Sequence, residues 1–373
     1  MSMWSNLPLD LLAKIFSFLS PDSLAIARSV CKNWHTCSKA YPIASTSATT
    51  TTSSWFLALP TRNHRPCCCY AHNPTIDKWH QLSLPLPSIR PIASIGGLLL
   101  LKVINSTTLQ LGLCNPFTGE FKHLPRLHAA RTNPAIGVTL SNSNSSQDDV
   151  RLPSFKVYVA GGMSEAAQGG ATYETKVEMY DSRVDTWQVV GSTPVEIAVR
   201  LTVWTPNESV CIGERLYWVT SARAYTVMGY DVGRNGWREL GVPMAERLEF
   251  ATLVKRNGAL GLVGGTCGGS GSIWELSEGD KWCLVEKVPL ELGLKLLGGK
   301  RVWESVKCVG NEDCICLYKN FGNGMVVCKR VGVMGRWEWI WVDGCHYIKG
   351  KQLPHCPIRG ALLHPTLASS LIY

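Results

Sequence analysis

The residues with the greatest capacity for chemistry in this sequence are its fifteen cysteines and nine histidines. Cys314 and Cys316 flank a single isoleucine, and three cysteines follow one another at 67–69. Thiolates can bind zinc, but structural zinc sites pair their ligands at CxxC-like spacing, which neither group has. On a strand, Cys314 and Cys316 would share one face and pack there as small apolar side chains. We therefore predict no metal site and no cofactor.

Histidines that could act as bases or ligands are spread along the C-terminal part of the chain, at His346, His355 and His364. Ordinary exposed or hydrogen-bonded histidines account for them. The motifs of a nucleophilic serine (GxSxG), a zinc protease (HExxH) and a phosphate-binding P-loop do not occur in the sequence. The sequence therefore predicts a protein that is not an enzyme.

The composition of the chain predicts the class of fold that positions these residues. The chain has 373 residues, of which 45% are hydrophobic and 17% charged, with 34 glycines and 14 tryptophans. This is typical of a folded, turn-rich, mainly β protein of two or three domains. The net charge of +9 is dispersed, which argues against nucleic acid as a partner because nucleic-acid binding needs a concentrated basic patch.

Targeting signals are not apparent. No basic segment precedes an apolar run at the N-terminus, and the run IGGLLLLKVI (95–104) is too short to span a bilayer. We expect a protein that is neither secreted nor embedded in a membrane. An odd number of cysteines then indicates thiols in a reducing compartment, so the expected location is the cytoplasm, the nucleus or both.

The first forty residues show helical periodicity. Leu11, Ile15 and Phe18 fall on one line of a helical wheel, with a second apolar line beside it. Ser20 and Pro21 can begin a second helix, and the spacing after Val30 predicts a third. Three short helices lie near the lower size limit for independent folding, and this apolar surface exceeds what one small core needs. We infer that another protein covers the remainder.

A motif recurs along the rest of the chain. Each copy has a polar residue, a turn-forming middle and then an aromatic residue, followed by proline. Five copies occupy 72–79, 114–121, 180–187, 230–237 and 274–282, and a degenerate sixth occupies 324–342. A period of 40 to 50 residues with a repeated tryptophan is typical of β-propeller blades, whereas a β-sandwich would not repeat one motif. We expect the motif's turn to join the third and fourth strands of each blade.

These residues carry a family resemblance. LPLDLLAKIFSFLSPDSLAIARSVCKNW resembles an F-box, and the GG…YD…W repeats resemble kelch blades. Together they resemble the F-box/kelch-repeat proteins abundant in plants. The implied fold is mainly β with a small α module. Its parts are a three-helix F-box (1–44), a Ser/Thr linker (45–54) and a six-bladed kelch-type β-propeller (55–373).

The resemblance also implies partners. F-box helices bind a Skp-family adaptor, and through it a cullin and a RING subunit of an SCF ubiquitin ligase. Matched by position, the candidate adaptor-binding residues are Leu7, Pro8, Leu12, Ile15, Leu19, Val30 and Trp34. For Phe16 and Phe18 we favour packing between the helices.

One arginine precedes the apolar strand that follows each repeat. The six are Arg90, Arg131, Arg200, Arg247, Arg301 and Arg359. They are predicted at equivalent positions near the start of each innermost strand, around one mouth of the central channel. They could hold neighbouring loops, or they could form a basic rim for an acidic or phosphorylated client, because arginine suits carboxylate and phosphate.

The resemblance implies a substrate-recognition subunit whose propeller binds a client protein for ubiquitination and degradation. The alternative is a kelch scaffold outside any ligase. A kelch-type oxidase is a third reading, but such oxidases are extracellular and nothing here singles out their Tyr/Cys/His set. The client itself is not predicted, since propeller loops vary on a fixed frame.

The first repeat is too short for a complete blade. WFLALP, CCCYAHNP and KWHQLSL supply three strands within 55–87, and the segment PIRGALLHPTLASS (357–370) has no blade of its own. We therefore predict that the C-terminal segment returns as the innermost strand of the first blade and so removes an open sheet edge.

Overall fold

The computed structural model describes most of the chain. The described residues are 7–17, 19, 27, 30–40, 53–61, 68–85, 89–104, 108–140, 154–166, 168–203, 209–299, 302–332, 335–348, 351–353 and 356–365. The predicted polar insertion at 141–149, the start of the second helix at Ser20–Pro21 and most of the linker lie outside these residues. Within them, no helix is both long enough and apolar enough to cross a membrane.

The described part of the N-terminal module contains two helices and, between them, the helical residues Ala27 and Val30. The two helices are α1 (Leu9–Ser17) and α3 (Lys32–Ala40). Leu12 and Phe16 of α1 are buried against Cys37 of α3, and the Cys37 thiol donates a hydrogen bond to the Leu9 carbonyl at 3.4 Å. The apolar line predicted from the helical wheel thus forms a small helical core.

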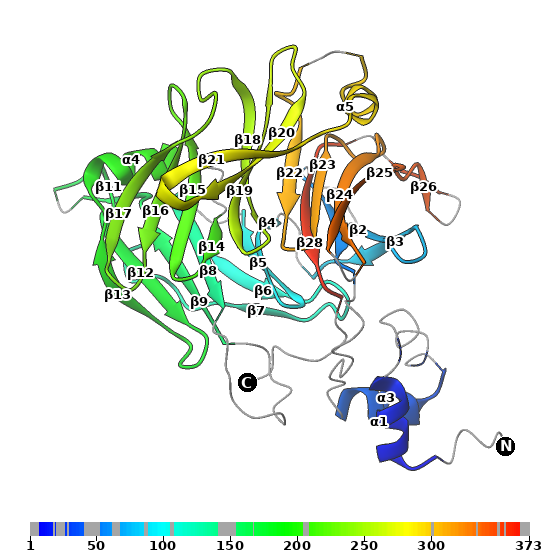
Figure 1. Ribbon diagram of the computed structural model, residues 1–373. Helices are drawn as coiled ribbons and strands as arrows, with labels where there is room; N and C mark the ends of the chain where they lie inside the picture. The colour runs from blue at the N-terminus through cyan, green and yellow to red at the C-terminus, as the bar shows by residue number, and fades with distance from the viewer. Residues whose placement is uncertain are drawn as a thin grey trace.

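Six four-stranded antiparallel sheets form the predicted propeller (Figure 1). From the innermost strand outward, blade 1 is β28 (Ile358–Leu363), β1 (Trp55–Pro60), β2 (Cys68–Asn73), β3 (Lys78–Ser83); blade 2 is β4 (Ile89–Ile95), β5 (Leu98–Val103), β6 (Leu111–Cys114), β7 (Phe121–His123); blade 3 is β8 (Ala135–Leu140), β9 (Phe155–Ala160), β12 (Lys176–Asp181), β13 (Thr186–Ser192). Blade 4 is β14 (Val210–Ile212), β15 (Arg215–Ser221), β16 (Tyr225–Asp231), β17 (Gly236–Gly241); blade 5 is β18 (Leu248–Arg256), β19 (Ala259–Thr266), β20 (Gly271–Ser277), β21 (Lys281–Lys287); blade 6 is β22 (Lys307–Gly310), β23 (Cys314–Tyr318), β24 (Met325–Val331), β25 (Arg336–Val342). Each innermost strand contacts the next, and the contacts close into a ring.

The remaining described elements lie outside the six blades. They are the two-stranded sheets β10 (Met163–Glu165) with β11 (Ala171–Tyr173) and β26 (Tyr347–Ile348) with β27 (Lys351–Gln352), the helices α4 (Val195–Val203) and α5 (Leu290–Leu297), and the 3-10 turn η2 (Glu278–Asp280). Helix α4 corrects the sequence analysis, which expected a strand directly after Arg200. Ala198, Leu201 and Thr202 are buried at helical spacing, so one face of α4 packs on the propeller.

The antiparallel topology gives the propeller two different faces. On one face lie the segments that join consecutive blades, including α4 and α5, and the innermost strands begin there. We call it the connection face. On the other lie the turns between the third and fourth strands, and we call it the turn face. Strand β1 begins beside the end of β28, so the helices α1 and α3 attach at the turn face, opposite α4 and α5 (Figure 1).

The C-terminal strand closes the ring as predicted. Strand β28 pairs with β1 in antiparallel register from Trp55↔Leu363 to Pro60↔Ile358, and it forms the innermost strand of blade 1. Both ends of the propeller therefore share one sheet, and the inner edge of β1 is covered.

The repeated turn joins the third and fourth strands of every blade, as predicted. In each blade the second residue before the outer-strand aromatic has a positive φ. These residues are Asp77 (49°), Gly119 (76°), Asp185 (54°), Asn235 (50°), Asp280 (58°) and Gly335 (64°). Asp, Asn and Gly tolerate this left-handed conformation best, which explains the polar and glycine residues in the motif. In blade 3 the Asp181 carboxylate also accepts the Arg183 N–H at 2.9 Å.

The aromatic residue after this turn connects neighbouring blades. In five blades it is a tryptophan whose indole N–H donates to an oxygen atom in the preceding blade or in the segment that follows that blade. The pairs are Trp79 to Asp343 O (3.0 Å), Trp187 to Pro125 O (2.8 Å), Trp237 to Ser192 O (3.0 Å), Trp282 to Gly241 O (2.7 Å) and Trp337 to Asn257 Oδ1 (3.3 Å). In blade 2 the position holds Phe121, which has no donor and contributes apolar contact alone.

Deleting residues 357–373 should unfold or aggregate the propeller. The deletion removes β28 and exposes the inner edge of β1. Size-exclusion chromatography and thermal melting of the truncated chain test this expectation. A soluble monomer with an unchanged melting transition would contradict the role of β28 in closure.

Replacing Trp282 by Phe should lower the free energy of unfolding by about 1 kcal/mol, because the aromatic packing is kept and one hydrogen bond between blades is lost. Chemical denaturation followed by fluorescence measures the change. Trp341→Phe is the matched control, since the Trp341 indole bonds only to Asp343, two residues away. Equal losses in the two variants would show that the contact between blades adds nothing.

Candidate protein-binding sites

Two of the apolar residues on α1 serve the helical core. Leu12 and Phe16 have almost no exposed surface, and Phe16 meets Trp34 edge to face at a centroid distance of 5.3 Å. The expectation that Phe16 packs between the helices is confirmed, and Phe18 lies outside the described residues. Leu12, which was predicted to contact an adaptor, is 1% exposed in the core of these helices.

The other predicted adaptor-binding residues are more accessible. Leu7, Ile15, Leu19 and Trp34 are half-buried at the edge of the helical core, whereas Pro8 and Val30 are exposed. Two exposed apolar residues were not among the predicted adaptor-binding residues: Leu9 and Leu11, with exposed fractions of 41% and 45%. The helical wheel placed Leu11 on the apolar arc, and this position could have identified it as a candidate for partner contact. Leu9, Leu11 and Val30 leave an apolar surface on the N-terminal module for a partner to cover.

Within the described part of the chain, Phe117 connects the propeller to the helical core. Phe117, in the turn between β6 and β7, packs against the helical core, and its ring meets Trp55 edge to face at 5.3 Å. Ser54, at the end of the predicted linker, is buried and accepts a hydrogen bond from the Asn311 side chain at 2.8 Å. The helices therefore rest on the turn face.

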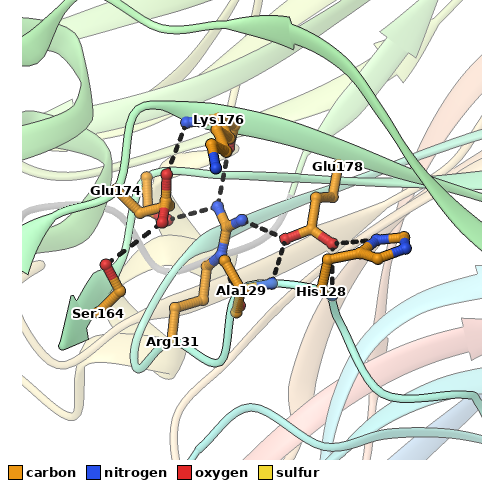
Figure 2. Close-up of polar contacts among 8 residues, drawn as sticks. His128, Ala129, Arg131, Ser164, Glu174, Lys176 and Glu178 are labelled. Carbon is orange, nitrogen blue, oxygen red and sulfur yellow. Dashed lines mark hydrogen bonds and ion pairs between the residues drawn. The ribbon is translucent and has the colours of Figure 1, made fainter. Parts of the chain in front are cut away.

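Among the predicted client-binding arginines, Arg131 is fully buried on the connection face. Figure 2 shows its guanidinium paired with the Glu178 carboxylate of β12. It also donates to the carbonyl oxygens of Gly161 (3.2 Å) and Lys176 (2.8 Å). Burial lowers the pKa of Arg131, and the charge of Glu178 opposes that shift.

Glu178 is equally buried and is satisfied by several donors. Its carboxylate accepts the backbone N–H groups of His128 at 2.7 Å and Ala129 at 3.1 Å, in addition to the Arg131 guanidinium (Figure 2). The pair therefore fixes the segment between blades 2 and 3 onto blade 3. This burial removes Arg131 from the residues that a client could reach.

The other arginines are not equivalent to one another. Arg200 lies on α4 and pairs with Glu239 of β17 at 2.5 Å, and Arg247 is exposed in the turn before β18. Arg301 lies outside the described residues. Arg90 and Arg359 are the second residues of the innermost strands β4 and β28. The prediction of a single ring of six equivalent arginines is therefore wrong. The described arginines of this set lie in strands, in a helix and in connections between blades.

Two lysines accompany the strand arginines and were missed in the sequence. Lys102 on β5 is the register partner of Arg90, and Lys307 begins β22 beside β28. Lys102 could have been noticed in the sequence because it is the one charged residue in the apolar run LLLLKV. Burial and the neighbouring arginine lower the pKa of each lysine.

The connection face also exposes large apolar side chains. In the segments that join blades 3 to 4, 4 to 5, 5 to 6 and 6 to 1, these residues have exposed fractions of 43% to 67%. They are Val195, Val203, Met244, Leu290, Val302 and Tyr347. Exposed apolar groups of this size, interspersed with Arg200 and Arg247, are suited to contact with another protein.

Two of the cysteines singled out in the sequence lie close together on β23. Cys314 and Cys316 share one face of β23, as expected, with sulfur atoms 3.6 Å apart. In that part of the chain no group of three or more His, Cys, Asp or Glu side chains is arranged to hold a metal ion. His364 is hydrogen-bonded to Ser54 at 3.2 Å, and His355 lies outside the described residues.

Comparison with known proteins matches two domain families. The F-box domain matches residues 4–43, and the kelch motif matches residues 156–194, which span blade 3 from β9 to β13. The described F-box helices α1 and α3 fall within the first match.

Known proteins with similar sequences include two from Arabidopsis thaliana and one from Homo sapiens. The chain is 23% identical over 384 residues to Protein UNUSUAL FLORAL ORGANS of Arabidopsis thaliana, covering 92% of this chain and 80% of the relative. It is 25% identical over 375 residues to an F-box/kelch-repeat protein of Arabidopsis thaliana, covering 93% of this chain and 86% of the relative. Kelch-like protein 23 of Homo sapiens is 28% identical over 169 residues, covering 43% of this chain and 25% of that protein.

Replacing Leu11 by Asp should weaken capture of a Skp-family adaptor by about tenfold or more, because a charge then interrupts the exposed apolar surface. Surface plasmon resonance with the full chain measures the affinity, and circular dichroism checks that the helices persist. Ile76→Asp is the matched control, since Ile76 has a similar exposed fraction of 48% in a turn of blade 1. Unaltered affinity in Leu11→Asp would exclude this surface.

Proposed function

We propose that this chain, which combines an F-box domain with a kelch-type propeller as plant F-box/kelch-repeat proteins do, is the substrate-recognition subunit of an SCF-type ubiquitin ligase. Its helices bind a Skp-family adaptor, which connects to a cullin and a RING subunit. Its propeller binds a client protein, which is then ubiquitinated and degraded. The chain itself catalyses nothing.

The observation that carries the proposal is the separation of two apolar surfaces. The exposed residues Leu9, Leu11 and Val30 belong to the N-terminal module, whose helices α1 and α3 lie at the turn face, and the exposed apolar residues of the connections lie on the opposite face. A rigid ring between them lets an adaptor and a client bind at once without competing. Holding both partners in one complex raises the effective concentration of client near the ubiquitin-carrying enzyme.

The cysteines agree with this role. All fourteen cysteines in the described residues are free thiols, and burial raises the pKa of most of those in the core, as for Cys114 and Cys328, each to about 12. Such thiols are stable in the reducing cytoplasm or nucleus, where we place the protein.

Reconstitution tests the ligase assignment. The full chain should co-purify with the adaptor, cullin and RING subunit, and the Leu11→Asp variant should lose all three together. Binding of the adaptor without the cullin would favour the alternative of a scaffold outside any ligase.

Clients should be captured by the connection face. In cells, proximity labelling with and without proteasome inhibition should identify proteins whose labelling rises when degradation is blocked. The double variant Met244→Asp with Leu290→Asp should lose most of these proteins while it retains the adaptor, because it interrupts the apolar surface of that face. The matched control is Val184→Asp with Val331→Asp, which changes exposed residues on the turn face. Equal loss in both double variants would contradict the assignment.

A further inference from the structure

Two half-buried lysines each lie beside an arginine, which carries the same charge. Lys102 of β5 faces the same side of blade 2 as its register partner Arg90 of β4. Among the described residues, no carboxylate or carbonyl group forms a hydrogen bond or ion pair with the Lys102 ammonium. Its surroundings therefore supply burial and a second positive charge, which both lower the pKa of Lys102.

The same arrangement occurs two blades away. Lys307 of β22 donates a hydrogen bond to the backbone carbonyl of Ile358 at 2.7 Å, which brings it beside Arg359 of β28. Burial and the charge of Arg359 lower the pKa of Lys307. A carbonyl dipole compensates part of this charge but cannot neutralise it.

These two pairs lie at one end of three adjacent strands. The strands β22, β28 and β4 are consecutive members of the innermost ring, and the Ser94 hydroxyl of β4 donates to the Leu362 carbonyl of β28. Lys307 is the first residue of its strand, and Arg359 and Arg90 are the second residues of theirs. All four cations therefore lie at the connection face, across blades 6, 1 and 2.

We propose that Arg90, Lys102, Lys307 and Arg359 form a binding site for a phosphate group. The half-buried ammonium charges of Lys102 and Lys307, each beside an arginine, cost free energy in the unliganded protein, and an oxyanion with two negative charges compensates them. Guanidinium groups pair with phosphate oxygens in a fork, and ammonium groups add point charges. Resting on the proposed function, we assign the phosphate to a phosphorylated side chain of the client.

The stability of one variant separates this site from a structural role. Replacing Lys102 by Met keeps an unbranched side chain of similar length and removes the charge. If Lys102 serves a ligand, the melting temperature of Lys102→Met without anion should be equal to or above that of the wild type. A lower melting temperature with unaltered anion binding would assign Lys102 to the fold and overturn the proposal.

Anion binding is measured on the full chain with pyrophosphate as the probe, at constant ionic strength set by chloride. Pyrophosphate should raise the melting temperature of the wild type, and isothermal titration should show affinity reduced about tenfold or more in Lys102→Met with Lys307→Met. Arg223→Met is the control, since Arg223 is exposed in the turn between β15 and β16 on the same face. Equal affinity in all three proteins would overturn the site.

Two further measurements separate this proposal from the proposed function. The Leu11→Asp variant should retain the pyrophosphate effect, because its change lies on the helices, so failure to bind an adaptor leaves the anion site intact. Phosphatase treatment of the cell extract should abolish capture of clients by the wild type. Capture that survives phosphatase would overturn the phosphorylated client as ligand and assign the site to a free phosphate compound.

Discussion

Contact between neighbouring blades is the interaction on which the rest of this structure depends. A single four-stranded sheet exposes two faces, and in this ring the neighbouring sheets bury both of them. Apolar side chains fill the seams, as where Phe56 of blade 1 meets Tyr318 of blade 6 at a centroid distance of 5.2 Å. At the outer strand, the tryptophans add a directional hydrogen bond to the neighbouring blade. Because each seam needs both neighbours, the ring gains its rigidity only when it closes.

Much of this frame was predictable because its determinants are local in sequence. The turn motif combines a left-handed residue with an aromatic two positions later, so Asp185 and Trp187 identify a blade without knowledge of the rest. The return of 357–370 followed from counting strands. The role of Arg131 could not be predicted, since its partner Glu178 lies 47 residues away and only the folded blade brings them together. Helix α4 was missed because VEIAVRLTV suits a buried strand as well as a helix.

The two faces of the propeller differ in how strictly the sequence is constrained. On the turn face, every turn must place a left-handed residue and an aromatic in register with the neighbouring blade. On the connection face, the segments between blades differ in length and structure, and two of them contain the helices α4 and α5. Sequence variation in the connections therefore alters the surface chemistry without disturbing the frame, which is the property expected of a face that recognises other proteins.

Closure by β28 also sets an order of events during synthesis. The partner strands β1 and β28 are separated by roughly 300 residues, which a ribosome adds in about 15 to 60 seconds. Throughout that interval the inner edge of β1 has no native partner. By its end, the sequence of blades 2 to 6 has been synthesised. The buried residues of the helical core, Leu12, Phe16, Ala27 and Cys37, all lie within the first forty residues, so this core can begin to form before the propeller, and Phe117 packs against it later. A nascent chain of this protein therefore presents its helical surface before its ring exists, while the inner edge of β1 stays unpaired until β28 has been synthesised.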